Sequence, residues 1–122
     1  MSVGLTRRHF FATLAAVTAS VPHAARAADD RPVFTFFRAF DCPHCKQAKP
    51  FVTQLEQQHP ELRFESFEVK KDKDGRRRFA KEVKRLGIAD PGVPLFVLGD
   101  AYVMGWVPPK TKRDVRRMIR RR

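Results

Sequence analysis

Apolar and polar residues follow one another along the chain with periods that predict strands and helices in turn. Residues 33–37 form a short apolar run rich in β-forming residues, which predicts a buried strand. Apolar positions three, four and seven residues apart then predict a helix that begins at the cysteine motif and ends at His59-Pro60. Pro50 is expected to kink this helix. Its apolar face comprises Ala48, Phe51, Val52 and Leu55.

The middle of the chain repeats this change of period. Residues 62–69 predict a second strand, but their alternation changes phase, which predicts a β-bulge near Ser66. A turn or helix cap at 72–75 opens a second helix, whose apolar residues recur four and seven positions apart. Gly87 is placed to end that helix.

The last third predicts a hairpin and a final helix. Strands at 94–98 and 101–106 are separated by Gly99-Asp100, which suits a two-residue hairpin turn. Thr111-x-x-Asp114 has the pattern of a capping box and is expected to open the last helix. The apolar side of that helix comprises Val115, Met118 and Ile119.

The predicted order of elements is therefore β-α-β-α-β-β-α. Because a helical crossover joins the first two strands, we expect them to be parallel, whereas the hairpin strands are antiparallel. The sequence predicts an α/β domain in which about three helices flank a four-stranded mixed sheet.

The first 27 residues differ from the rest and predict an export signal. Arg7 and Arg8 precede an apolar stretch at 10–21, and Ala25-Arg26-Ala27 provides the small-x-small pattern of a cleavage site. Residues 6–11 resemble the twin-arginine export motif. A short buried N-terminal helix is the alternative. We expect residues 28–122 to form the mature domain in the periplasm or another extracytoplasmic compartment.

The chain is strongly basic, with a formal net charge of +12. Loss of residues 1–27 would lower this charge to +9, because that segment contains three arginines and no acidic residue. Residues 110–122 contain eight Lys or Arg and one Asp. This end predicts either a solvated helix face or contact with an acidic partner or an anionic membrane surface. No nucleic-acid-binding motif is present in the sequence, so nucleic acid is not expected as a partner.

The chemistry is expected at Cys42-Pro43-His44-Cys45, which contains both cysteines of the chain. A disulfide across two residues closes a very small loop and constrains the unfolded chain little, so reactivity explains the pair better than stability does. Pro43 suits the first helical turn, which places Cys42 at the N-cap.

At that position Cys42 is near free backbone N–H groups and the positive end of the helix dipole. These features favour the thiolate, so Cys42 is predicted to be the nucleophile and Cys45 the resolving thiol. His44 lies between them and is predicted to stabilise the Cys42 thiolate. A stabilised thiolate makes the disulfide a stronger oxidant.

Cysteine and histidine residues in such motifs can also bind haem or metal ions. Haem attachment needs Cys-x-x-Cys-His, but residue 46 is Lys. A closed zinc site needs about four ligands. A copper or zinc carrier using Cys42, His44 and Cys45 remains an alternative, as does a purely structural disulfide. We expect no resident metal and no cofactor other than the redox-active disulfide.

These features together resemble the thioredoxin superfamily. The resemblance rests on the first strand, the Cys-Pro-His-Cys helix start and the segment 92–97, and it covers nearly all of the mature chain. It implies that Pro94 is a cis-proline facing the cysteines. It also implies that the backbone of Val93 pairs with a bound substrate segment. Phe40, Tyr102 and Trp106 are expected to pack in the core or at its rim.

Within the superfamily, the motif is similar to that of DsbA-type disulfide oxidases, whereas the length is similar to that of small thioredoxin-like or glutaredoxin-like domains. The chain has no room for the helical insertion of DsbA-type proteins between Gly87 and Val93. It has Val93 where glutaredoxins usually have Thr, and Phe36 where thioredoxins have a buried Asp. The implied activity is disulfide exchange with protein thiols and disulfides. The expected direction is oxidation of the substrate, with a membrane redox partner for recycling. A reductant in an exported thiol-reducing pathway is the alternative enzyme.

Overall fold

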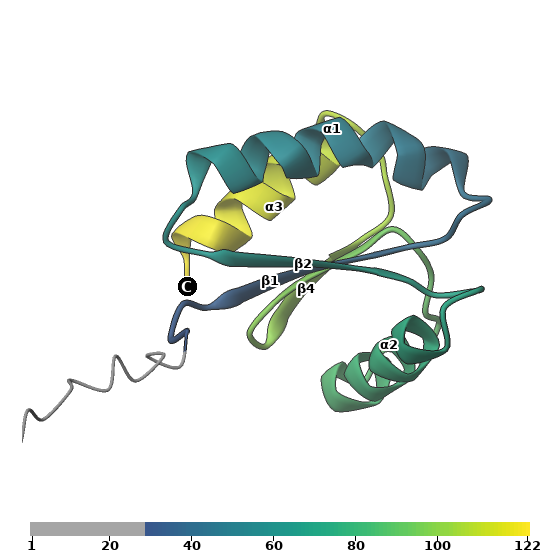
Figure 1. The fold of residues 1–122 in the computed structure, drawn as a ribbon. Helices are drawn as coiled ribbons and strands as arrows, with labels where there is room; N and C mark the ends of the chain where they lie inside the picture. The colour runs from purple at the N-terminus through teal and green to yellow at the C-terminus, as the bar shows by residue number, and fades with distance from the viewer. Residues whose placement is uncertain (1–28) are drawn as a thin grey trace, which may run out of the picture.

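The computed structural model describes residues 29–122, so the predicted export signal at 1–27 lies outside the described residues. Figure 1 shows the elements, which run in the order β1 (Val33–Arg38), α1 (Pro43–Gln58), β2 (Arg63–Glu68), α2 (Lys73–Leu86), β3 (Leu95–Leu98), β4 (Ala101–Met104) and α3 (Lys110–Arg120). Within this part of the chain, no helix is both long and apolar enough to cross a bilayer.

The strands form one mixed sheet in the order β2-β1-β3-β4. β1 is parallel to β2 and antiparallel to β3, and β3 pairs with β4 as a hairpin. Helices α1 and α3 cover one face of the sheet and α2 covers the other (Figure 1). The predicted α/β architecture and element order are confirmed.

The larger apolar core lies between the sheet and the α1–α3 layer. Phe34 and Phe96 are fully buried there, and Phe36 stacks on Phe96 with ring centroids 5.3 Å apart. Phe51 of α1 packs against Trp106, 5.8 Å between centroids. The predicted inner faces of both helices are confirmed, because the core also includes Ala48, Leu55, Val115, Met118 and Ile119. α1 continues through Pro50 as one helix.

A second apolar core lies between the sheet and α2. It explains why β2 has no bulge near Ser66, contrary to the prediction. The parallel register of β1 and β2 runs without interruption past Ser66. Phe64 packs on the α1–α3 side, whereas Phe67 packs on the α2 side. The sequence changes phase because the strand has apolar neighbours on both faces, which is typical of sheets covered by helices on both sides.

The helix ends confirm two predictions and contradict one. Asp72 caps α2 by accepting N–H bonds from its first turn, and Gly87 ends it with a positive φ of 66°. The capping box at Thr111 was wrong, because α3 begins at Lys110 with Pro109 as its N-cap. The Thr111 hydroxyl instead turns back and accepts the N–H of Val107 at 2.8 Å.

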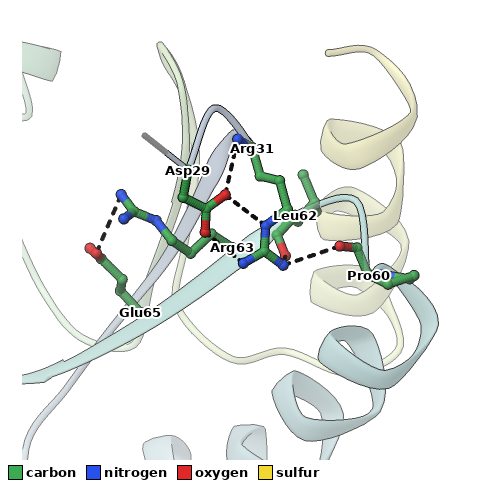
Figure 2. Close-up of polar contacts among 6 residues, drawn as sticks. All are labelled: Asp29, Arg31, Pro60, Leu62, Arg63 and Glu65. Atoms are coloured by element: carbon green, nitrogen blue, oxygen red, sulfur yellow. Dashed lines mark hydrogen bonds and ion pairs between the residues drawn. The ribbon is translucent and has the colours of Figure 1, made fainter. Parts of the chain in front are cut away.

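The segment that leads into β1 is held against the chain before β2 (Figure 2). The guanidinium of Arg31 donates to both carboxylate oxygens of Asp29, at 2.6 and 2.8 Å, and to the carbonyl oxygens of Pro60 and Leu62, at 3.2 and 3.4 Å. The hydrogen bond from Arg31 is the largest cause that lowers the pKa of Asp29 to about 2. These contacts connect the start of the described residues to the turn that precedes β2.

Gly75 in α2 allows the helix to pack closely against the end of β2. A Cβ at this position would collide with the backbone carbonyl oxygen of Glu68. We expect Gly75→Ala to lower the free energy of unfolding by about 1–3 kcal/mol, because the collision outweighs the better helix propensity of alanine. Urea denaturation of the variant measures this, with Lys81→Ala on the exposed side of α2 as the control. An increase in the urea midpoint would contradict the close contact.

Candidate active site

The Cys42-Pro43-His44-Cys45 motif forms the junction between β1 and α1, as predicted. Cys42 is the N-cap of α1, with extended backbone angles, and Pro43 is the first helical residue. The backbone N–H of Cys45 points at Cys42 Sγ, with an N···S distance of 3.1 Å. Cys42 and Cys45 form a disulfide, with their Cα atoms 5.2 Å apart.

The two sulfurs differ in their access to solvent. Cys45 is only 3% exposed and belongs to the α1–α3 core, whereas Cys42 is partly exposed at the core's edge. An incoming thiolate therefore reaches Cys42 first. This asymmetry is the one that dithiol exchange requires, because one sulfur must meet the substrate and the other must resolve the mixed disulfide.

His44 occupies the second helical position, and its side chain is exposed. It lies two residues after Cys42 in the chain, with Pro43 between them. Its influence on the Cys42 thiolate stays a prediction.

The segment before β3 lies next to Cys42. The Val93–Pro94 peptide bond is cis, as the family resemblance implies. The carbonyl oxygen of Val93 lies 4.0 Å from Cys42 Sγ, and Pro94 is buried. The fold therefore brings four of the predicted site residues together from two distant parts of the sequence. The role of Val93 and Pro94 in substrate binding stays a prediction.

The three aromatic residues predicted to pack in the core or at its rim have different positions. Trp106 is buried in the α1–α3 core, whereas Tyr102 on β4 is exposed. Phe40 is 45% exposed and lies two residues before Cys42, with Lys71 Nζ 3.8 Å from its ring centroid. Phe40 therefore adds apolar surface to the loop that leads to Cys42.

Sequence reasoning missed Glu68, the last residue of β2. Its carboxylate accepts the backbone N–H of Phe40 at 2.8 Å, and also those of Lys70, Lys71 and Asp72. Because β1 and β2 are parallel, their carboxyl ends meet at one edge of the sheet, so an acidic residue at the end of β2 was a usable signal.

The hydrogen bonds to Glu68 determine its charge state. Partial desolvation raises its pKa, but the four backbone N–H donors outweigh that effect and lower the pKa from 4.5 to about 2. The pKa of Glu68 is lower in the folded chain than in the unfolded chain. Its carboxylate therefore stabilises the folded chain at pH values above its ordinary pKa of 4.5. That contribution is lost as the pH falls toward 2.

Within residues 29–122, no group of three or more His, Cys, Asp or Glu side chains is arranged to hold a metal ion. Metal binding by Cys42, His44 and Cys45 would require the dithiol form, so the metal-carrier alternative stays a prediction.

No family model matches the sequence, and no curated protein is significantly similar to it. Among solved structures, the chain is similar to the oxidised mitochondrial thioredoxin 3 of Saccharomyces cerevisiae. The TM-score is 0.53 and the identity is 26%, over 71% of this chain and 78% of that one. The glutaredoxin of Archaeoglobus fulgidus gives a TM-score of 0.51 and 25% identity, over 68% and 85%.

A thioredoxin from Fasciola hepatica supports the same fold, with a TM-score of 0.53 and 21% identity over 71% of this chain and 80% of that one. These similarities agree with the disulfide at the start of α1. The chain has a thioredoxin-like fold, and its Cys42–Cys45 pair supports thiol–disulfide oxidoreductase activity.

Proposed function

We propose that the chain is an exported oxidant that transfers its Cys42–Cys45 disulfide to protein thiols. The observation that supports this most directly is the N–H of Cys45 aimed at Cys42 Sγ at the N-terminus of α1. In the dithiol form this N–H and the helix dipole stabilise a Cys42 thiolate. Stabilising the reduced form makes the disulfide a stronger oxidant.

The reaction consists of two exchanges. A substrate thiolate attacks Cys42 Sγ, the Cys42–Cys45 bond breaks, and Cys45 leaves as a thiolate that takes up a proton. A second substrate thiolate then attacks the substrate sulfur of the mixed disulfide, and Cys42 leaves. The substrate gains a disulfide, and the protein gains two electrons, with a proton on Cys45 and a thiolate at Cys42.

The neighbouring residues support these steps. His44 adds a hydrogen-bonding or positively charged imidazole near the Cys42 leaving group. The backbone of Val93 and the ring of Pro94 form the surface on which an extended substrate segment lies, next to Cys42. A membrane redox partner re-oxidises the dithiol.

Location and surface charge belong to the same proposal. Residues 1–27 resemble a twin-arginine signal and support export, where disulfides persist. Six of the basic residues at 110–122 lie on α3, and the rest follow it. They support contact with an anionic membrane surface or an acidic partner.

The direction of electron flow is tested by the equilibrium potential of the Cys42/Cys45 couple. We expect a value nearer about −120 mV than the roughly −270 mV of thioredoxin, because His44 and the helix N-terminus favour the Cys42 thiolate. Equilibration with glutathione buffers of known ratio, read by thiol alkylation, measures it. His44→Ala is the matched variant and should have a lower potential.

Other results would support the alternatives. A wild-type potential below about −250 mV would contradict the oxidant and favour a reductant. Stoichiometric binding of copper or zinc by the dithiol form, without exchange with glutathione, would favour the metal carrier.

A further inference from the structure

Glu68 connects the redox centre to the loop that follows β2. Its Oε2 accepts the N–H of Phe40 at 2.8 Å, on the loop that leads to Cys42. Its Oε1 accepts the N–H groups of Lys70 at 2.8 Å and Asp72 at 3.2 Å, and that of Lys71 between them. One carboxylate therefore joins two loops that are about 30 residues apart in the sequence.

Two further contacts join the same loops. Lys70 Nζ lies 2.6 Å from the carboxylate of Asp41, and Lys71 Nζ lies over the ring of Phe40. Both are exposed and are worth little individually. They nevertheless place residues 40 and 41, which directly precede Cys42, against residues 70 and 71. We call residues 39–42 the redox loop.

We propose that Glu68 is a positioning residue for the redox centre. Its hydrogen bond to the redox loop determines how readily the Cys42–Cys45 disulfide is reduced. This inference rests on the proposed exchange function. It concerns a residue that does not itself touch the reacting sulfurs.

The hydrogen bond from Phe40 to Glu68 contributes more to the position of Cys42 in the dithiol form than in the disulfide form. In the disulfide form the covalent bond to Cys45 also fixes Cys42. After reduction, Cys42 is positioned by its own backbone, whose N–H donates to the carbonyl oxygen of Ala39 at 3.2 Å, and by the neighbouring bond from Phe40 to Glu68. The thiolate receives the N–H of Cys45 only while Cys42 stays at the N-cap. Weakening the hydrogen bond between Phe40 and Glu68 therefore destabilises the dithiol form selectively.

The negative charge of Glu68 has the opposite effect on the stability of the dithiol form. Two variants are therefore needed to separate the effect of the charge from that of the hydrogen bonds. Removing a negative charge near Cys42 favours its thiolate. Glu68→Gln removes the charge and also weakens the hydrogen bonds to the two loops. Glu68→Asp keeps the charge but is one methylene shorter, so it cannot reach both loops equally well. Glu65→Gln is the matched control, because Glu65 lies on the same strand and pairs with Arg63.

The experiment measures the equilibrium of each full-length variant with glutathione, two molecules of which supply two electrons and two protons as they form glutathione disulfide. We expect Glu68→Asp to shift the equilibrium toward the Cys42–Cys45 disulfide by roughly three- to tenfold, the range of one hydrogen bond. The pKa of the Cys42 thiol, followed by thiolate absorbance, should increase in the same variant. Glu65→Gln should match the wild type in both measurements.

Each contrary result has a distinct meaning. An equilibrium unchanged in Glu68→Asp, with only the thermal midpoint lowered, would make Glu68 purely structural and overturn the proposal. A shift toward the dithiol in Glu68→Gln, with none in Glu68→Asp, would show a charge effect alone and also overturn it. A wild type that does not equilibrate with glutathione would instead contradict the proposed function.

A measurement on the wild type covers the case in which the variants do not fold. In the dithiol form, the Phe40 amide should exchange its hydrogen at least roughly tenfold more slowly than an unprotected amide, because the bond to Glu68 persists after reduction. Exchange at the unprotected rate would overturn the proposal.

Discussion

Replacing Cys42 with serine is expected to reduce disulfide exchange to the uncatalysed background. Serine can neither form a disulfide nor ionise near neutral pH, and Cys45 is too buried to meet a protein substrate itself. The rate at which a reduced two-cysteine peptide becomes oxidised, with glutathione disulfide as the final oxidant, measures the loss.

Cys45→Ser is the matched variant, because it removes the resolving sulfur and leaves the exposed one. It should still form mixed disulfides with substrates but should fail to release them, so covalent complexes accumulate. Non-reducing electrophoresis detects these complexes, and dithiothreitol should reduce them to the separate proteins. Equal trapping by Cys42→Ser would contradict the assigned roles, and no trapping by Cys45→Ser would contradict exchange with proteins.

Phe34→Ala is expected to have the largest effect on stability. Phe34 is 0% exposed and lies between Phe64 and Phe96, with ring centroids 4.9 and 6.3 Å away. Truncating such a residue costs about 3–5 kcal/mol, through lost apolar burial and the cavity left behind. Domains of this size are stable by only about 5–15 kcal/mol, so a large part of the stability should be lost.

Phe40→Ala provides the matched control, since the same substitution is made where the ring is 45% exposed. Its stability should fall by about 1 kcal/mol at most, mainly through the lost contact with Lys71. Urea denaturation of the two variants in the disulfide form measures both values. A Phe34→Ala midpoint equal to that of Phe40→Ala would contradict the position of Phe34 at the centre of the core.

Local sequence patterns were enough to predict the elements of this fold and the position of its redox motif. Strands, helices and hairpin followed from local periods and from residues such as Asp72, Gly87 and Gly99, whose preferences act within a few positions of the chain. The Cys42 N-cap was predictable for the same reason, because Pro43 and the following apolar spacing define where α1 begins. The site of exchange was therefore a local property.

Features that depend on contacts between distant residues could be seen only in the folded chain. The phase change in β2 required no bulge, because α2 covers the face that the pattern alone would have left to solvent. Thr111 capped no helix, because its hydroxyl found the N–H of Val107 instead. Glu68 became part of the site only because parallel pairing brings the ends of β1 and β2 together, so that four backbone N–H groups from two loops converge on one carboxylate.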